Sequence, residues 1–170
     1  MNHDQFYGQL DKFPHHPQTA TPGPETFARA YEQAAVDKND QIFAIHVAGS
    51  LSAAFHSAQK GAEMTQISVT THDSGQLGFG AGMQVLAAAQ AAARGATINQ
   101  IKQIVQDLGN RTYIFAALDT LKYLQRSGRM SMTMLGIGSL LHIKPLLKMH
   151  CGEPVSEKIT THSRAIQRVL

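Results

Sequence analysis

The chain has 170 residues, 43% of them hydrophobic and 16% charged, which is typical of a compact domain with a buried core and excludes a largely disordered chain. The formal net charge of +3 is mild, and no run of five Lys or Arg residues occurs, so the charge gives no argument for nucleic acid binding. The single cysteine excludes an internal disulfide and an all-cysteine zinc site.

The first residues, MNHDQFYGQLDKF, are polar and of mixed charge, so we expect no signal peptide there. The longest apolar segment, 81–93, is too short to cross a bilayer, which takes about 20 residues. A lone cysteine also fits a reducing compartment. The sequence therefore predicts a cytoplasmic protein without integral membrane association.

Strand and helix patterns alternate in the first half of the chain. The prolines of HHPQTATPGPE mark a loop, and Pro24 then opens a helix with apolar residues at helical spacing. QIFAIHV predicts a buried strand, followed by a helix over 51–61. ISVTTHDS predicts a second strand, followed by an alanine-rich helix over 79–94. Because that helix is apolar nearly all round, we expect it to pack on two sides.

The alternation continues along the chain. Thr97 and Gln100 form a capping-box pattern at the start of another helix. TYIFAAL predicts a third strand and 121–126 a short helix. Strands that alternate with helices indicate an α/β fold with a parallel sheet.

The amino-acid composition changes after Arg129, where methionine and glycine become frequent. IKPLLKM predicts a strand, a turn follows at Cys151 and Gly152, and PVSEKIT predicts an antiparallel partner. We therefore expect a parallel α/β lobe over 1–118 and the beginning of a second lobe over 119–170.

Parallel sheets bind ligands at the carboxyl ends of their strands, which directs attention to the loops 48–52, 73–82 and 118–121. The first loop carries Ser50 and Ser52 at the start of a helix. Helix N–H groups and hydroxyls at this place favour an anionic group. Serine is also a preferred N-cap residue of helices, and the sequence leaves both interpretations open.

Motifs for catalysis are missing. The glycines of GQLGFGAG do not have the G-x-G-x-x-G spacing, and no G-K-[ST] follows, so we expect no nucleotide cofactor. The nine histidines form neither H-x-x-x-H nor H-E-x-x-H, which gives no argument for a metal site. No G-x-S-x-G motif of a serine hydrolase is present. The motifs therefore give little evidence for catalysis, and we expect no enzyme activity.

Five segments taken together resemble the DegV family of bacterial fatty-acid-binding proteins. TATPGPETFARAYEQA is similar to the family's T-S-Q-P-x-x-x-x-F-x-x-x-Y-E, and IHVAGSLSAAFHSA to I-x-I-S-S-x-L-S-G-T-Y-x-S-A. HDSGQLGFGAG resembles D-S-x-x-x-S-x-G-x-G, and ALDTLKYLQRSGRMS resembles T-L-x-Y-L-x-x-G-G-R-I-S. LLHIKPLLKMHCGEPV is similar to L-L-x-I-K-P-I-L-x-x-x-x-G. The segments occur in the family's order and cover almost the whole chain, which makes 1–170 a single DegV-like domain.

The resemblance implies a two-lobed α/β protein that encloses one long-chain fatty acid. Thr19 and Ser52 match the family hydroxyls that bind the carboxylate, together with N–H groups at the start of a helix. An apolar tunnel for the acyl chain could be lined by adaptable side chains, for which the candidates are Met130, Met132, Met134 and Leu135, followed by Leu140 and Leu141. For any single one of these, an ordinary place in the core is an equally good interpretation.

Gly128 and Arg129 fall on the Gly-Arg of the family motif. In relatives that serve as subunits of a fatty acid kinase, this region faces the kinase, which phosphorylates the bound carboxylate. The resemblance therefore implies that Arg129 faces a fatty acid kinase catalytic subunit, while Arg126 is solvated. The competing interpretation is an exposed arginine that offsets the dipole at a helix end.

The chain departs from the family pattern near the carboxylate, where Ala20, Ala48 and Ala54 replace residues with polar side chains. The family's first strand, with its D-S-x-x-D-L motif, and its C-terminal part have no counterpart, so we expect a relative truncated at both ends. An unpaired sheet edge beside apolar surface then predicts oligomerisation or low stability. The alternatives are an anion-binding or protein-interaction module without lipid, or a truncated relative without function.

Overall fold

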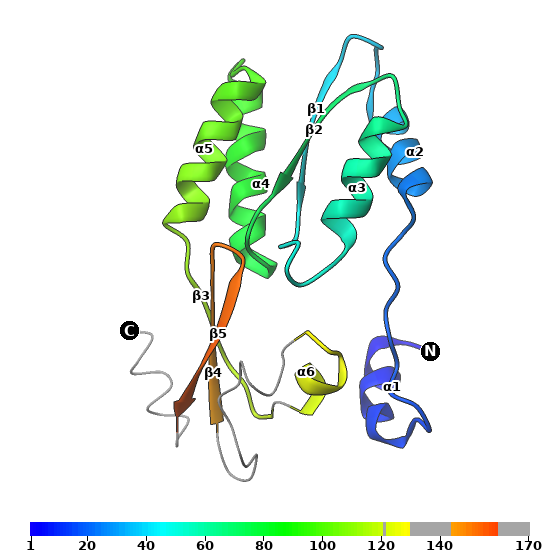
Figure 1. Ribbon diagram of the computed structural model, residues 1–170, viewed down its shortest axis with the longest axis vertical. Helices are drawn as coiled ribbons and strands as arrows, with labels where there is room; N and C mark the ends of the chain where they lie inside the picture. Colours follow the sequence, from blue (N-terminus) through cyan, green and yellow to red (C-terminus); the bar gives the residue numbers. More distant parts are fainter. Residues whose placement is uncertain (121, 130–143, 160–170) are drawn as a thin grey trace.

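The computed structural model describes residues 1–120, 122–129 and 144–159. Within these residues the strands form two separate sheets, which lie one above the other in Figure 1. β1 (Gln41–His46) and β2 (Ser68–Asp73) pair in parallel, from Gln41 opposite Ser68 to His46 opposite Asp73. The predicted parallel pair is thereby confirmed, and the two strands end side by side.

Helices cover both faces of the parallel pair (Figure 1). On one side α2 (Pro24–Ala34) packs against α3 (Ala54–Glu63), and on the other α4 (Gly78–Ala93) packs against α5 (Ile98–Asn110). Gly61 allows the close contact between α2 and α3, since a Cβ atom there would lie 2.6 Å from the carbonyl oxygen of Pro24. The result is a three-layer α/β/α arrangement.

The hydrophobic core of the α/β/α arrangement lies between α4, α5 and β1. Its buried residues come from the two helices, and strand residues pack against them; the set consists of Ala88, Ala91, Ile101 and Val105, with Phe43, Ile45 and Ala96 at the edge. Thr97 caps α5 through the predicted capping box, in which its hydroxyl accepts the Gln100 N–H and the Gln100 side chain accepts the Thr97 N–H.

Two details of the helices differ from the prediction. α3 begins at Ala54, not at residue 51, because the chain first makes a turn in which the N–H groups of Leu51 and Ser52 both donate to the Ala48 carbonyl. The expectation that α4 packs on two sides is wrong within the described residues. One stripe that includes Gln84 and Ala91 is buried, whereas Phe79 is 88% exposed and Met83 and Leu86 are exposed as well.

The second sheet is antiparallel, in the order β3 (Ile114–Ala117), β4 (Lys144–His150), β5 (Glu153–Ile159). The predicted β4–β5 hairpin is confirmed. The third predicted strand forms, but it does not extend the parallel sheet; β3 pairs antiparallel with β4. Its residues alternate between half-buried and exposed, as in a sheet with one solvated face, whereas strands of a covered parallel sheet are buried on both faces. The boundary between the lobes at 118 and 119 stays a prediction.

Three short helical segments lie at the level of the second sheet in Figure 1. For two of them, α1 and η1, the sequence predicted no element. α1 (His3–Gly8) begins with a capping box between Asn2 and Gln5, and η1 (Leu10–Lys12) follows directly. α6 (Lys122–Arg126) lies beside them in Figure 1. Between η1 and α2 the chain forms no helix or strand. In Figure 1 this segment leads from the height of the antiparallel sheet up to α2, which covers the parallel sheet.

Candidate functional site

The loops that follow β1 and β2 are joined by one carboxylate. Asp73, the last residue of β2, accepts the Gly49 N–H at 3.1 Å and the Gly75 N–H at 2.9 Å. The Ala48 N–H donates to the Gln76 carbonyl oxygen at 2.9 Å. Hydrogen bonds therefore join the loop after β1 to the loop after β2, at the carboxyl ends of the strands where a ligand was expected.

The two serines of the first loop have different partners. The Ser52 hydroxyl oxygen accepts the Ala54 N–H at 3.2 Å, so this side chain satisfies one N–H group at the start of α3. Its own O–H hydrogen remains able to donate. The Ser50 hydroxyl instead donates to the Gly152 carbonyl oxygen at 2.5 Å, in the turn between β4 and β5. The sequence offered no signal for that contact, which joins residues 102 positions apart.

The turn between β4 and β5 also contacts the loop that follows β2. Cys151 and Gly152 adopt φ angles of 48° and 83°, and the Gly152 N–H donates to the Gly75 carbonyl oxygen at 2.8 Å. The loops after β1 and β2 are thus both bonded to the β4–β5 turn. A pocket of about 270 Å³ lies beside it, lined by His72, Asp73, Ser74, Gly75, Val105, Gln106, Gly109, Asn110, Cys151 and Gly152.

Thr19 and Arg129 lie in contact. The Arg129 guanidinium donates from Nη2 to the Thr19 hydroxyl oxygen at 3.1 Å, and from Nη1 to the Ser127 carbonyl oxygen at 3.1 Å. Gly128 ends the turn after α6 with a φ of 71°, a conformation that side-chain-bearing residues rarely adopt. Thr19 and Arg129 are both exposed. Folding therefore brings two of the predicted site residues together.

Arg129 also borders an apolar cavity of about 100 Å³ between the antiparallel sheet, α6 and the start of α4. Leu51, the neighbour of Ser52, lines the same cavity. The remaining lining residues are Leu77, Ile114, Ala116, Leu124, Leu147, Lys148, Met149 and Pro154. The tunnel candidates Met130, Met132, Met134 and Leu135, with Leu140 and Leu141, lie outside the described residues.

Two half-buried histidines stand near the ends of the parallel strands. Burial lowers the pKa of His46, against a smaller opposing effect of the Asp73 charge. Burial likewise lowers the pKa of His72, whose Nε2 lies 3.1 Å from the Gln84 side-chain oxygen. Both imidazoles are therefore mainly neutral at pH 7 and do not supply positive charge to an anion.

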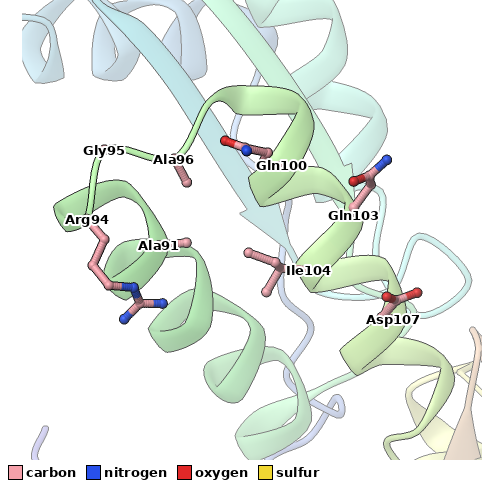
Figure 2. Close-up of a pocket in the computed structure, with 8 residues that line it drawn as sticks. All are labelled: Ala91, Arg94, Gly95, Ala96, Gln100, Gln103, Ile104 and Asp107. Carbon is pink, nitrogen blue, oxygen red and sulfur yellow. The ribbon is translucent and has the colours of Figure 1, made fainter.

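Two further grooves contain none of the predicted site residues. An open groove of about 530 Å³ lies between the end of α4 and α5. Figure 2 shows its lining residues, with Arg94 and Asp107 among them. Gln100 also lines it, but its side-chain oxygen already accepts the Thr97 N–H of the helix cap. A second, more apolar groove of about 340 Å³ runs over β1, α4 and α5.

The described residues contain no group of three or more His, Cys, Asp or Glu side chains placed to hold a metal ion. Nor does any helix in the described ranges have the length and apolar character needed to cross a membrane.

Comparison with known proteins gives a consistent result. A family model described as "Uncharacterised protein, DegV family COG1307" matches residues 1–170. The DegV domain-containing protein SCO2569 of Streptomyces coelicolor is 34% identical over 153 residues, which are 89% of this chain and 54% of the relative. A DegV domain-containing protein of Deinococcus radiodurans is 35% identical over 136 residues, 80% of this chain and 48% of the relative. The chain thus spans about half the length of these relatives.

Solved structures show the same fold. A DegV family protein from Thermus thermophilus, described by its fatty acid binding, superimposes with a TM-score of 0.85 at 27% identity, over 97% of this chain and 59% of that protein. A DegV lipid-binding protein from Thermotoga maritima gives a TM-score of 0.81 at 22% identity, over 96% of this chain and 57% of that protein.

Proposed function

The chain belongs to the DegV family, and from this premise we propose that it binds one long-chain fatty acid. The similar protein of Thermus thermophilus is described as binding fatty acid. In this chain the carboxylate is held by the hydroxyls of Thr19 and Ser52 and by N–H groups at the start of α3. The acyl chain enters the apolar cavity bordered by Leu51 and Arg129.

The observation that carries the proposal is the contact between Thr19 and Arg129 beside that cavity. A fatty acid needs hydrogen-bond donors for its charged end and apolar lining for the rest. The Thr19 hydroxyl accepts from Arg129 and so keeps its own hydrogen for a carboxylate oxygen. Hydrogen bonds to a charged group are stronger than those between neutral groups, which suits a carboxylate at the mouth of the cavity.

The cavity is small for this task. Its volume of about 100 Å³ is below the roughly 300–1,000 Å³ typical of ligand pockets, so the described residues enclose part of an acyl chain. We propose Met130, Met132, Met134 and Leu135 as further lining residues. Unbranched methionine side chains adapt to different acyl chains, which favours them in such a tunnel.

The second half of the proposal concerns presentation of the bound lipid. Arg129 is exposed and follows Gly128, whose φ of 71° ends the turn after α6. A guanidinium in this position can contact phosphate or carboxylate oxygens in a bidentate manner. We therefore assign Arg129 to the surface that faces a fatty acid kinase subunit, and the chain itself to the role of a binding protein that presents the substrate.

A second candidate function is association with a protein, including a second copy of this chain. The apolar face of α4, formed by Phe79, Met83 and Leu86, is exposed among the described residues. Large exposed apolar faces are typical of interaction sites. This function is compatible with lipid binding, because none of Thr19, Ser52 and Arg129 lies on α4.

The decisive experiment is native mass spectrometry of the protein purified from cells. We expect a co-purifying mass of one long-chain fatty acid, and a lower occupancy when Thr19 and Ser52 are both replaced by alanine. If the purified protein contains no lipid and binds no added palmitate, the proposal is contradicted.

A further inference from the structure

The carboxylate of Asp11 contacts three side chains of α6. It accepts a hydrogen bond from Nζ of Lys122, with which it forms an ion pair, and one from the Tyr123 hydroxyl at 3.1 Å. Nη1 of Arg126 lies 3.9 Å from the same carboxylate. The hydrogen bond from Lys122 is the main cause that lowers the pKa of Asp11, so its side chain stays charged at neutral pH.

Asp11 belongs to the segment 2–19, here called the N-terminal arm. Two further contacts join this arm to the same part of the chain. The His16 ring stacks on the Tyr123 ring with centroids 6.1 Å apart, and Thr19 accepts the hydrogen bond from Arg129. Figure 1 shows α1 beside α6, with the arm continuing toward α2. In the described residues these contacts join the arm to α6 and to the turn that follows it.

α6 needs this support. It has five residues, too few for a helix to be stable by itself, and none of them is fully buried; its apolar contact is the half-buried Leu124 at the cavity. A single exposed ion pair contributes little, but several charges on one partner form a network that can hold two segments together. The contacts of Asp11 are the densest polar contacts between the arm and α6 in the described residues.

We propose that Asp11 is a positioning residue for the head-group site: it anchors the N-terminal arm to α6 and so holds Thr19 beside Arg129 at the mouth of the cavity. This inference rests on the proposed function, since it concerns the same carboxylate. Asp11 itself does not touch the ligand. It limits the movement of Thr19, eight positions further along the arm, and thereby lowers the entropic cost of binding.

The test compares Asp11→Asn with Asp4→Asn, using palmitate and hexadecanol as probes. Asp4 lies on the same arm, its side chain is 98% exposed, and its ion pair is with His3 alone among the described residues, so it is the matched control. We expect Asp11→Asn to weaken palmitate binding about tenfold and to change hexadecanol binding much less, because Thr19 forms a stronger hydrogen bond with a charged carboxylate than with a neutral hydroxyl. Lys122→Met should give the same selective loss by removing the other partner. Asp4→Asn should bind both probes like the wild type.

Hydrogen exchange of the ligand-free proteins gives a second readout. The Ser127 and Gly128 amides, which bond to the carbonyls of Tyr123 and Gln125, should exchange faster in Asp11→Asn and unchanged in Asp4→Asn. If the wild type binds palmitate and Asp11→Asn binds it equally well, the positioning role is overturned while fatty acid binding stands. An equal loss for palmitate and hexadecanol also overturns it, since Asp11 then supports only the cavity. A wild type that binds neither probe overturns the proposed function, and the inference with it.

Discussion

The guanidinium of Arg129 and the hydroxyl of Thr19 form a hydrogen bond with an Nη2–Oγ1 distance of 3.1 Å, although the residues are 110 positions apart. The contact places an exposed cation next to a hydroxyl that can donate to an anion. It also suggests a division of roles, in which Thr19 holds the carboxylate and Arg129 stays available to a partner. Each role can be tested separately.

The first prediction concerns the head-group hydroxyls. Thr19→Ala and Ser52→Ala should each weaken fatty acid binding by roughly 1.5–3 kcal/mol, a factor of about 10 to 100, because each removes one hydrogen bond to a charged group. Titration with palmitate measures this. Ser57→Ala is the control, since Ser57 lies on α3 and its hydroxyl already donates to the Pro22 carbonyl. Unchanged affinity in both variants, with folding intact, means that the carboxylate is held elsewhere.

The second prediction separates the two arginines. Arg129→Ala should keep its bound lipid, because Asp11 still anchors the arm that carries Thr19, but lose most acyl-phosphate formation with a cognate kinase subunit. Arg126→Ala should change little in either assay, since Lys122 and Tyr123 remain on the Asp11 carboxylate. Equal, near-wild-type behaviour of the two variants reduces Arg129 to a charge at a helix end.

The third prediction concerns pH. Burial lowers the pKa of both His46 and His72 in the folded protein below the ordinary value of 6.5, so the unfolded chain binds more protons. Their contribution to the free energy of unfolding is therefore complete above pH 6.5 and is lost as the pH falls from there toward the lowered values. Urea unfolding at a series of pH values measures the slope. His72→Gln should flatten it, whereas a change at the exposed His3 should not; a slope of opposite sign contradicts the assignment.

The fourth prediction uses two glycines in helices. Gly61→Ala should destabilise the protein by roughly 1–3 kcal/mol, because the new Cβ atom would overlap the Pro24 carbonyl oxygen and the Phe27 side chain. Gly82→Ala is the matched control in α4, where no atom lies within 4 Å of the new Cβ, and should stabilise by about 0.5–1 kcal/mol. Urea unfolding gives both values. Equal effects at the two positions would show that the contact between α2 and α3 adapts.

The fifth prediction concerns the exposed apolar face of α4. The wild type should self-associate with rising concentration, and Met83→Gln combined with Leu86→Gln should weaken that association. Sedimentation velocity measures the mass. Val36→Gln, on a side chain that is 99% exposed and outside α4, is the control and should not change it. A wild type that stays monomeric at high concentration removes the argument for this interface.

Local patterns accounted for much of the fold. The parallel pair of β1 and β2, the β4–β5 hairpin and the capping box of Thr97 were all predicted, because each depends on residues that are near in sequence or on the usual order of strands and helices. The motifs also selected Thr19 and Arg129, which the structure then showed to be in contact. The role of each in binding stays a prediction.

The sequence by itself determined the five strands and the helices that follow residue 23, since hydrophobic period, caps and turn residues act over a few positions, but not α1 and η1. Only the tertiary structure decided that β3 pairs with β4 and not with the parallel strands, and that one face of α4 stays uncovered. It also decided that Asp11 meets Lys122 across 111 positions and that Ser50 meets the β4–β5 turn. These contacts depend on how whole elements pack, and no local period encodes which distant surface a given face or carboxylate will meet.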